Sequence, residues 1–206
     1  MCKLMRKFYL FLRIKIRHIR LRLSNRPAND LSRKQQILLE IGWSYNCSTF
    51  IETGTFLGDT IEIMRRYFDR VVSVEVSREL YNLNKQRFEK RKNVFLYQGD
   101  SGELMSEMLE HKTGRALFWL DAHYSGPGTA RGAKECPLTA ELESIAKYPR
   151  NDHCILIDDK DALTGKNDYP PLHQVKEMLL QINPNFEISE KNNILIALPP
   201  IHSISL

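Results

Sequence analysis

The sequence predicts a doubly wound α/β domain built on a mostly parallel, seven-stranded sheet. Short, nearly continuous apolar runs alternate along most of its 206 residues with segments that carry apolar residues at helical spacing. This alternation is typical of parallel strands that are buried under helices on both faces. A hydrophobic content of 42% and a charged content of 27% are globular values, and they exclude a wholly disordered chain.

The net charge of +5 is concentrated at the N-terminus. Residues 1–24 contain eight Lys or Arg and no acid, whereas the rest of the chain has 22 basic and 25 acidic residues. We therefore expect a basic amphipathic tail over residues 1–29 and a mildly acidic domain over residues 30–206. The tail either contacts an anionic membrane surface, packs on the domain or forms a disordered leader. An acidic domain does not favour nucleic acid as a partner.

The location predicted for the protein is cytoplasmic, with the tail as a peripheral contact at the inner face of a membrane. The longest apolar run near the N-terminus, Phe8–Leu12, is too short for a membrane span or a signal peptide. The four cysteines have neither zinc-site spacing nor the density of a disulfide scaffold, so reduced thiols are expected. The oligomeric state does not follow from the sequence.

The individual elements follow from these patterns in order. Ser32 can cap a first helix that runs to about Ile41. Five apolar runs predict parallel strands: Thr49–Ile51, Val71–Val76, Val94–Tyr97, Ala116–Leu120 and Cys154–Ile157. Pro170 and Pro171 can open a last helix. The runs Phe186–Ser189 and Asn193–Leu198, with a short polar connection, predict an antiparallel hairpin at the sheet edge.

The segment that follows the first strand carries a cofactor signal. Gly54 permits a tight turn and a close approach to a ligand, and Gly58 permits close packing at the start of the next helix. The glycine-rich dinucleotide pattern would place glycines where Glu52 and Leu57 stand. A carboxylate there repels a pyrophosphate and attracts a cationic amino-acid ligand, which favours S-adenosylmethionine over a dinucleotide. Further candidate cofactor contacts in this segment are Thr55 and Thr60.

More carboxylates follow the next strands. Glu75 lies 21 residues after Gly54, where an acid can accept hydrogen bonds from ribose hydroxyls. Asp100, followed by Ser101, could bind the adenine amino group, although an acid there could equally cap a helix. Three acids in register after three successive strands, Glu52, Glu75 and Asp100, make the chain resemble the class I S-adenosylmethionine-dependent methyltransferases over roughly residues 45–200. Asp121, after the fourth strand, is a further candidate cofactor contact. This resemblance implies a methyltransferase that uses S-adenosylmethionine.

Acids at the ends of the fourth and fifth strands predict a metal site. Asp121, Asp158 and Asp159 should meet at one edge of the sheet, and clustered carboxylates suit Mg²⁺ or another hard divalent cation. The alternative for Asp158 and Asp159 is a pair of turn-forming acids after a buried strand. The trio resembles the metal site of the magnesium-dependent O-methyltransferases, with the macrocin O-methyltransferase-like sugar enzymes as the nearest pattern. That resemblance implies metal-assisted transfer to a hydroxyl of a small molecule or a glycan.

Two residues are candidates for the general base. His123 follows Asp121 by two positions and has an ordinary pKa near the working pH, although it could instead have a structural role. Lys160 is the second candidate. The Gly- and Pro-rich segment 125–137 is expected to form a lid over the acceptor, with Arg131 and Lys134 available to an anionic group. A different class of function also fits: a non-catalytic nucleotide- or S-adenosylmethionine-binding module, tethered by its basic tail to membrane or nucleic acid.

Overall fold

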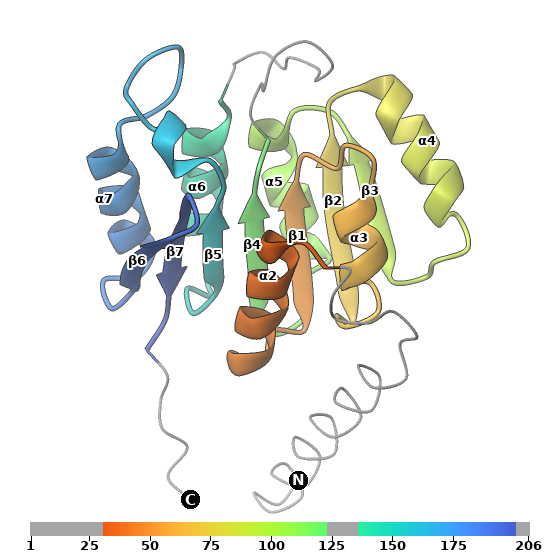
Figure 1. Cartoon of the computed structure of the whole chain (residues 1–206), viewed down its shortest axis with the longest axis horizontal. Coiled ribbons are helices and arrows are strands. Elements are labelled where there is room, and N and C mark those ends of the chain that lie inside the picture. Colours follow the sequence, from red (N-terminus) through yellow and green to blue (C-terminus); the bar gives the residue numbers. More distant parts are fainter. Residues whose placement is uncertain (1–30, 123–135, 201–206) are drawn as a thin grey trace, which may run out of the picture.

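A computed structural model of the chain describes residues 31–122 and 136–200 (Figure 1). The strands, in chain order, are β1 (Thr49–Thr53), β2 (Arg70–Glu75), β3 (Val94–Gln98), β4 (Ala116–Leu120), β5 (Cys154–Ile157), β6 (Glu187–Lys191) and β7 (Ile194–Leu198). The helices are α2 (Arg33–Ser44), α3 (Asp59–Met64), α4 (Arg78–Phe88), α5 (Ser101–Glu110), α6 (Leu138–Ala146), the short 3₁₀ turn η2 (Lys160–Ala162) and α7 (Leu172–Ile182).

The strands form one seven-stranded sheet in the order β3-β2-β1-β4-β5-β7-β6. Strands β1 to β5 are parallel, and β7 lies antiparallel between β5 and β6. The predicted doubly wound sheet with a C-terminal hairpin at its edge is confirmed. The order reverses between β1 and β4, because the chain leaves β1 toward β2 on one side and later returns to pair β4 on the other. In open α/β sheets such a point is where ligands bind, outside the carboxyl ends of the strands.

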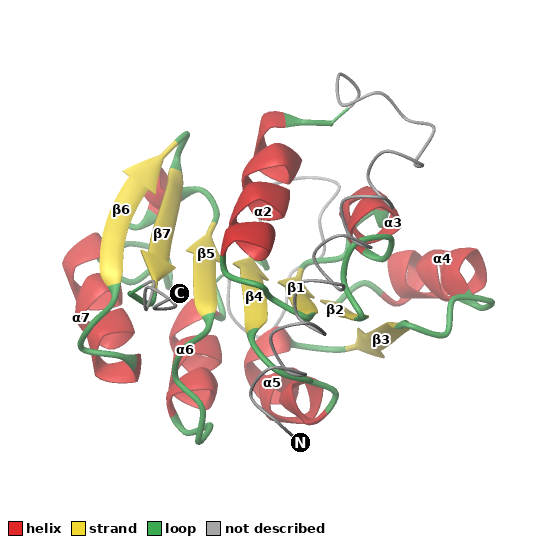
Figure 2. Ribbon diagram, turned by 90° about the horizontal axis from the view of Figure 1, so that it is seen from below, coloured by secondary structure: helices red, strands yellow, loops and turns green. Residues whose placement is uncertain are grey.

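Helices cover both faces of the sheet (Figure 2). Helices α2, α3 and α4 lie on one face, and α5, α6 and α7 lie on the other. Successive strand residues point to opposite faces, so Phe50 packs with the α2–α4 layer while Ile51 packs with the α5–α7 layer. All five residues of both β1 and β4 are buried, which explains the continuous apolar run of β4.

Local sequence determines where several of these helices and strands begin and end. Ser32 caps α2 in a reciprocal pair with Gln35, as its residue type predicted, but the helix continues beyond Ile41 to Ser44. In the hairpin, the turn falls on Asn192 and Asn193, which have φ values of 52° and 62°. Asparagine tolerates this left-handed conformation, which two-residue hairpin turns require. The strand β6 therefore extends to Lys191, past the predicted end at Ser189.

Several predictions fall outside the described residues: the tail over 1–29, His123, and most of the segment 125–137, including Arg131 and Lys134. Within the described part, no helix has the length and apolar character needed to cross a bilayer. Cys47, Cys136 and Cys154 are buried free thiols. The Sγ atoms of Cys47 and Cys154 lie 3.8 Å apart without a disulfide.

Candidate functional site

The turn after β1 lies at the point where the strand order reverses. The backbone N–H groups of Gly54 and Thr55 both donate to the carbonyl of Val74, at 3.0 and 3.1 Å, so the turn stays against the end of β2. Gly54 has a φ of 85°, and a Cβ there would lie 2.8 Å from the carbonyl oxygen of Asp121. Glycine is therefore required both for the turn and for the close contact between the ends of β1 and β4.

Gly58 lets α3 begin directly against α4. Its φ is 78°, and a Cβ would lie 2.8 Å from a ring atom of Phe88 and closer still to the side chain of Asn84. Asn84 is fully buried, and its amide donates to the carbonyl of Phe56 at 2.6 Å. The prediction that Gly58 permits close packing at the helix start is confirmed, and the packing partner is α4.

Glu75 organises the turn from the end of β2. One carboxylate oxygen accepts from the backbone N–H of Phe56 at 2.8 Å, and the other accepts from the N–H of Ser77 at 2.9 Å. Its side chain is 6% exposed. Phe56 has a left-handed φ of 49°, which is costly for a bulky residue. The bond to Glu75 helps to hold that conformation, so the acid connects the β1 turn with the start of α4.

Glu52 lies beneath the turn in a buried polar network. The hydroxyl of Ser73 donates to Glu52 at 3.0 Å and lies 2.7 Å from the hydroxyl of Thr55. The hydroxyl of Thr60 also favours the charged form of Glu52. Burial nevertheless dominates and, together with the nearby Asp121 and Glu75 carboxylates, raises the pKa of Glu52 well above its usual value. The structure thus brings Glu52, Thr55 and Thr60 together beneath the turn.

Asp100 and Ser101 start α5 at the end of β3. Asp100 is the N-cap residue, and its carboxylate accepts from the N–H of Gly102 at 2.8 Å. The helix-cap interpretation is therefore realised, while its carboxylate keeps lone pairs that could serve a ligand. Ser101 is 4% exposed, and its hydroxyl favours the charged form of Glu141 on α6. Ser101 consequently lies toward the α5–α6 layer.

Asp121 and Asp158 face the same side of the sheet from neighbouring strands. Leu120 pairs with Ile157, so the next two residues stand side by side, and the N–H of Asp158 donates to the carbonyl of Leu120 at 3.0 Å. Alternation along the strands places both carboxyls on the α2 side, since Trp119 and Leu156 pack in that layer. Burial, and then the Asp158 charge, raise the pKa of Asp121 above its usual value. The predicted convergence of these two acids is confirmed.

The cation that the structure places among these acids is a side chain of the same protein. The Nζ atom of Lys34, on α2, lies 2.5 Å from Oδ2 of Asp158 and 3.8 Å from Oδ1 of Asp159. The Lys34 ammonium also lowers the pKa of Asp121. Within residues 31–122 and 136–200, no group of three or more His, Cys, Asp or Glu side chains is arranged to hold a metal ion. As arranged here, Asp121, Asp158 and Asp159 do not fit the Mg²⁺ site that the sequence predicts, because Lys34 already pairs with Asp158 and lies near Asp159.

Lys160 does not fit the role of general base. Its ammonium pairs with Asp161 at 2.9 Å and with Glu190, on β6, at 3.2 Å. The hydrogen bonds that the ammonium donates to these carboxylates raise the pKa of Lys160 and so favour the charged form, which has no lone pair to accept a proton. The contacts tie η2 to the hairpin.

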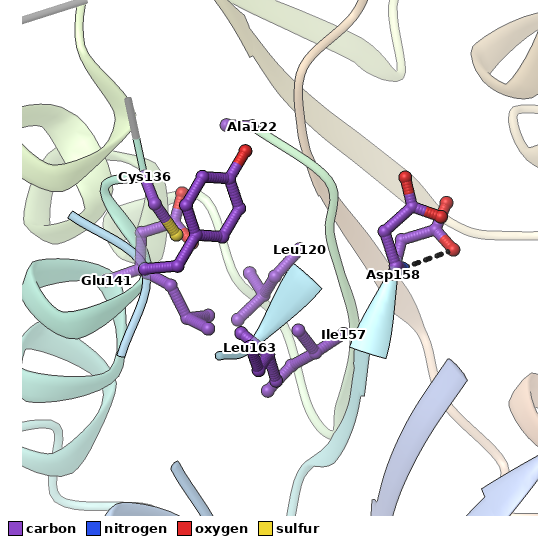
Figure 3. A pocket seen from close by; sticks show the side chains of 10 residues that line it. Leu120, Ala122, Cys136, Glu141, Ile157, Asp158 and Leu163 are labelled. Carbon is purple, nitrogen blue, oxygen red and sulfur yellow. Dashed lines mark hydrogen bonds between the residues drawn. The ribbon is translucent and has the colours of Figure 1, made fainter. Parts of the chain in front are cut away.

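A partly open pocket lies beside this edge, behind the ends of β4 and β5 (Figure 3). Its walls are mainly apolar, with Leu120, Ile157 and Leu163 in the centre. Glu141, which is 1% exposed, and Cys136 lie on one side of these residues, while the carboxylate of Asp158 lies beyond the end of β5 on the other. Oε1 of Glu141 has no hydrogen-bond partner among the described residues, and burial raises the pKa of Glu141 to about 7.

Sequence reasoning missed several residues of this site. The sequence around Lys34 does not indicate its role, because its partner Asp158 lies 124 positions away. Ser73 did leave a signal, as a polar residue within the apolar β2 run. Glu141 also left one, since it stands between Leu138 and Leu142 on the buried face of α6.

Known proteins resemble this chain in structure rather than in sequence. No protein-family model matches the sequence, and no curated protein matches it either. The structure resembles that of an O-methyltransferase from Bacillus cereus in complex with SAH, with a TM-score of 0.57, 15% identity, and 90% of each chain covered.

Two other solved structures have similar scores. The O-methyltransferase TomG from Streptomyces achromogenes, involved in tomaymycin synthesis and solved with SAM, has a TM-score of 0.54 at 14% identity, covering 91% of this chain and 90% of TomG. The N-methyltransferase NodS from Bradyrhizobium japonicum has a TM-score of 0.53 at 13% identity, covering 81% of this chain and 95% of NodS. The chain thus has the fold of class I S-adenosylmethionine-dependent methyltransferases, a fold that serves both oxygen and nitrogen acceptors.

Proposed function

We propose that this chain is an S-adenosylmethionine-dependent O-methyltransferase that acts on a hydroxyl group of a small molecule or a glycan. The observation that carries the proposal is the position of Glu75. It is a buried carboxylate at the end of β2, bonded to the glycine turn that follows β1, beside the reversal of strand order. A nucleoside at this edge would meet a carboxylate acceptor, a tight turn and the start of a helix together.

The acids around the turn suit this cofactor. Glu52, Glu75 and Asp121 surround the turn, and their carboxyl oxygens can accept hydrogen bonds from the amino group and the hydroxyls of a nucleoside ligand. When bound, S-adenosylmethionine supplies a methyl group made electrophilic by the sulfonium centre. Glu75 would hold the ribose hydroxyls through the lone pairs that the N–H groups of Phe56 and Ser77 leave available. Asp100 would hold the adenine amino group.

The acceptor would lie at the edge of the sheet beside the pocket behind β4 and β5. The apolar side chains of Leu120, Ile157 and Leu163 could contact its carbon skeleton there, and Tyr169 and Glu141 offer polar contacts. We assign the proton of the acceptor hydroxyl to His123, which comes two residues after Asp121 in the sequence. Metal assistance is left out of the proposal, because Lys34 already pairs with Asp158.

Calorimetric titration with S-adenosylhomocysteine tests the proposed cofactor site. The wild-type chain should bind the nucleoside, and Glu75→Gln should weaken binding by about tenfold or more, since it removes a charged acceptor of hydrogen bonds. The control is Glu107→Gln, an exposed glutamate on α5, which should leave the affinity unchanged. Thermal melts should show that both variants are folded. Equal affinities for wild type and a folded Glu75→Gln would refute the assignment of Glu75.

A further inference from the structure

The acidic edge of the sheet carries an internal cation. Asp158 has a side chain that is 2% exposed, and its main ionic partner is Lys34 at 2.5 Å. Asp159 lies next in the chain, with Oδ1 3.8 Å from the same ammonium, and Asp121 stands beside Asp158 on β4. Lys34 thus interacts with the three acids that the sequence assigned to a metal.

The start of α2 places Lys34 beside these acids, and its side chain is 45% exposed. The capping pair of Ser32 and Gln35 sets the start of α2, so Lys34 lies in the first turn of that helix. One turn later, Ile37 and Leu38 are buried against the sheet and anchor the helix. The Lys34 ammonium also lies 6.0 Å from the centre of the Trp119 ring, within the range of a cation–π contact. The backbone that carries this cation is therefore anchored to the sheet.

The charge of Lys34 disfavours the binding of a divalent ion at this position. A divalent ion at the same place would have to displace the ammonium from a nearly completely buried carboxylate, and it would meet the charge of Lys34 at close range. Asp158 Oδ1 is also engaged, because it accepts from the N–H of Asp159 at 2.9 Å. The ligand set that remains is poorer than the several free carboxylate oxygens that Mg²⁺ or Mn²⁺ requires.

We propose that the Lys34 ammonium takes the place of a divalent metal among Asp121, Asp158 and Asp159, so that the chain binds no divalent ion there. On the proposed function, it follows that methyl transfer needs no added metal. Lys34 is then a positioning residue, which holds Asp158 and the end of β5 beside the acceptor pocket. Removing its charge should leave buried carboxylates uncompensated, and these should recruit an external cation.

Mn²⁺ titration followed by electron paramagnetic resonance tests this proposal without any cofactor or acceptor. The wild-type chain should leave the signal of aqueous Mn²⁺ unchanged. Lys34→Met should gain a Mn²⁺ site with an affinity about tenfold or more above that of wild type. Adding Asp158→Asn to that variant should abolish the site. The control is Lys90→Met, an exposed lysine after α4, which should behave as wild type.

Two results would overturn the proposal. The first is Mn²⁺ binding by the wild-type chain that Asp158→Asn removes. The second is a folded Lys34→Met variant with no gain of Mn²⁺ binding. If Lys34→Met does not fold, the wild-type titration and Asp158→Asn still decide the question. Because no nucleoside is present, failure of this proposal is distinct from failure of S-adenosylmethionine binding.

Discussion

Glu141 shows how a single carboxyl group can oppose the fold that surrounds it. It lies on the buried face of α6 with one oxygen unpartnered among the described residues, and burial raises its pKa to about 7 from an ordinary value of 4.5. Between these two pH values the folded chain holds a proton that the unfolded chain has lost. Stability from this group is therefore present below pH 4.5 and is lost as the pH rises through 7.

Replacing Glu141 with Gln should remove this dependence. The amide keeps the shape of the side chain and carries no charge, so Glu141→Gln should be more stable than wild type above pH 7, by about 3 kcal/mol at most. The two proteins should converge below pH 4.5. Urea unfolding at a series of pH values measures the difference. Glu143→Gln, an exposed neighbour on α6, should show no such trend, and a pH-independent difference for Glu141→Gln would contradict the account.

The sequence predicts the roles of some site residues but not of others. Glu75 was predictable because its role depends on a local pattern, an acid at the end of the second strand. The pairing of Asp121 with Asp158 followed from parallel strands that end at one edge. Lys34 was not predictable, since the charge that it neutralises lies on another layer of the fold. The metal prediction rested on the acids alone and left out this nearby cation.

At the scale of elements, the turn from β1 to α3 depends on two glycines with different partners. Gly54 contacts the backbone of β4, and Gly58 contacts side chains of α4. Strand interiors were predictable to within a residue or two, because buried runs are continuous: Ala116–Leu120 and Cys154–Ile157 coincide with β4 and β5. The hairpin turn was displaced from its predicted place, since Asn192 and Asn193 fix it through their left-handed backbone.

Alanine substitution at two glycines separates packing from backbone strain. Gly58 and Gly165 both have a φ of 78°, so alanine should cost each about 1–2 kcal/mol for the left-handed conformation. At Gly165 the nearest atom would lie 3.5 Å from the new Cβ, an ordinary contact, whereas at Gly58 it would clash with Phe88 at 2.8 Å. Gly58→Ala should therefore lose about 1–3 kcal/mol more, measured by chemical unfolding. Equal losses would mean that α3 and α4 are not tightly packed there.

At the scale of the whole molecule, the architecture follows from alternation alone, while the acceptor does not. Parallel strands joined by helices leave few topologies, and the observed order β3-β2-β1-β4-β5-β7-β6 is one of them. On the proposed function, the acceptor is selected by side chains from β4, β5 and α6, while most of the predicted lid over 125–137 lies outside the described residues. The solved methyltransferases of the same fold have only 14% and 15% sequence identity to this chain, so they do not identify its acceptor.

A crystal structure of the full chain with S-adenosylhomocysteine is the most direct test. We expect the nucleoside to lie across the carboxyl ends of β1 and β2. Both ribose hydroxyls should be within hydrogen-bonding distance of Glu75, and the thioether should be directed toward Asp121. A nucleoside held elsewhere, or a ribose that makes no contact with Glu75, would contradict it.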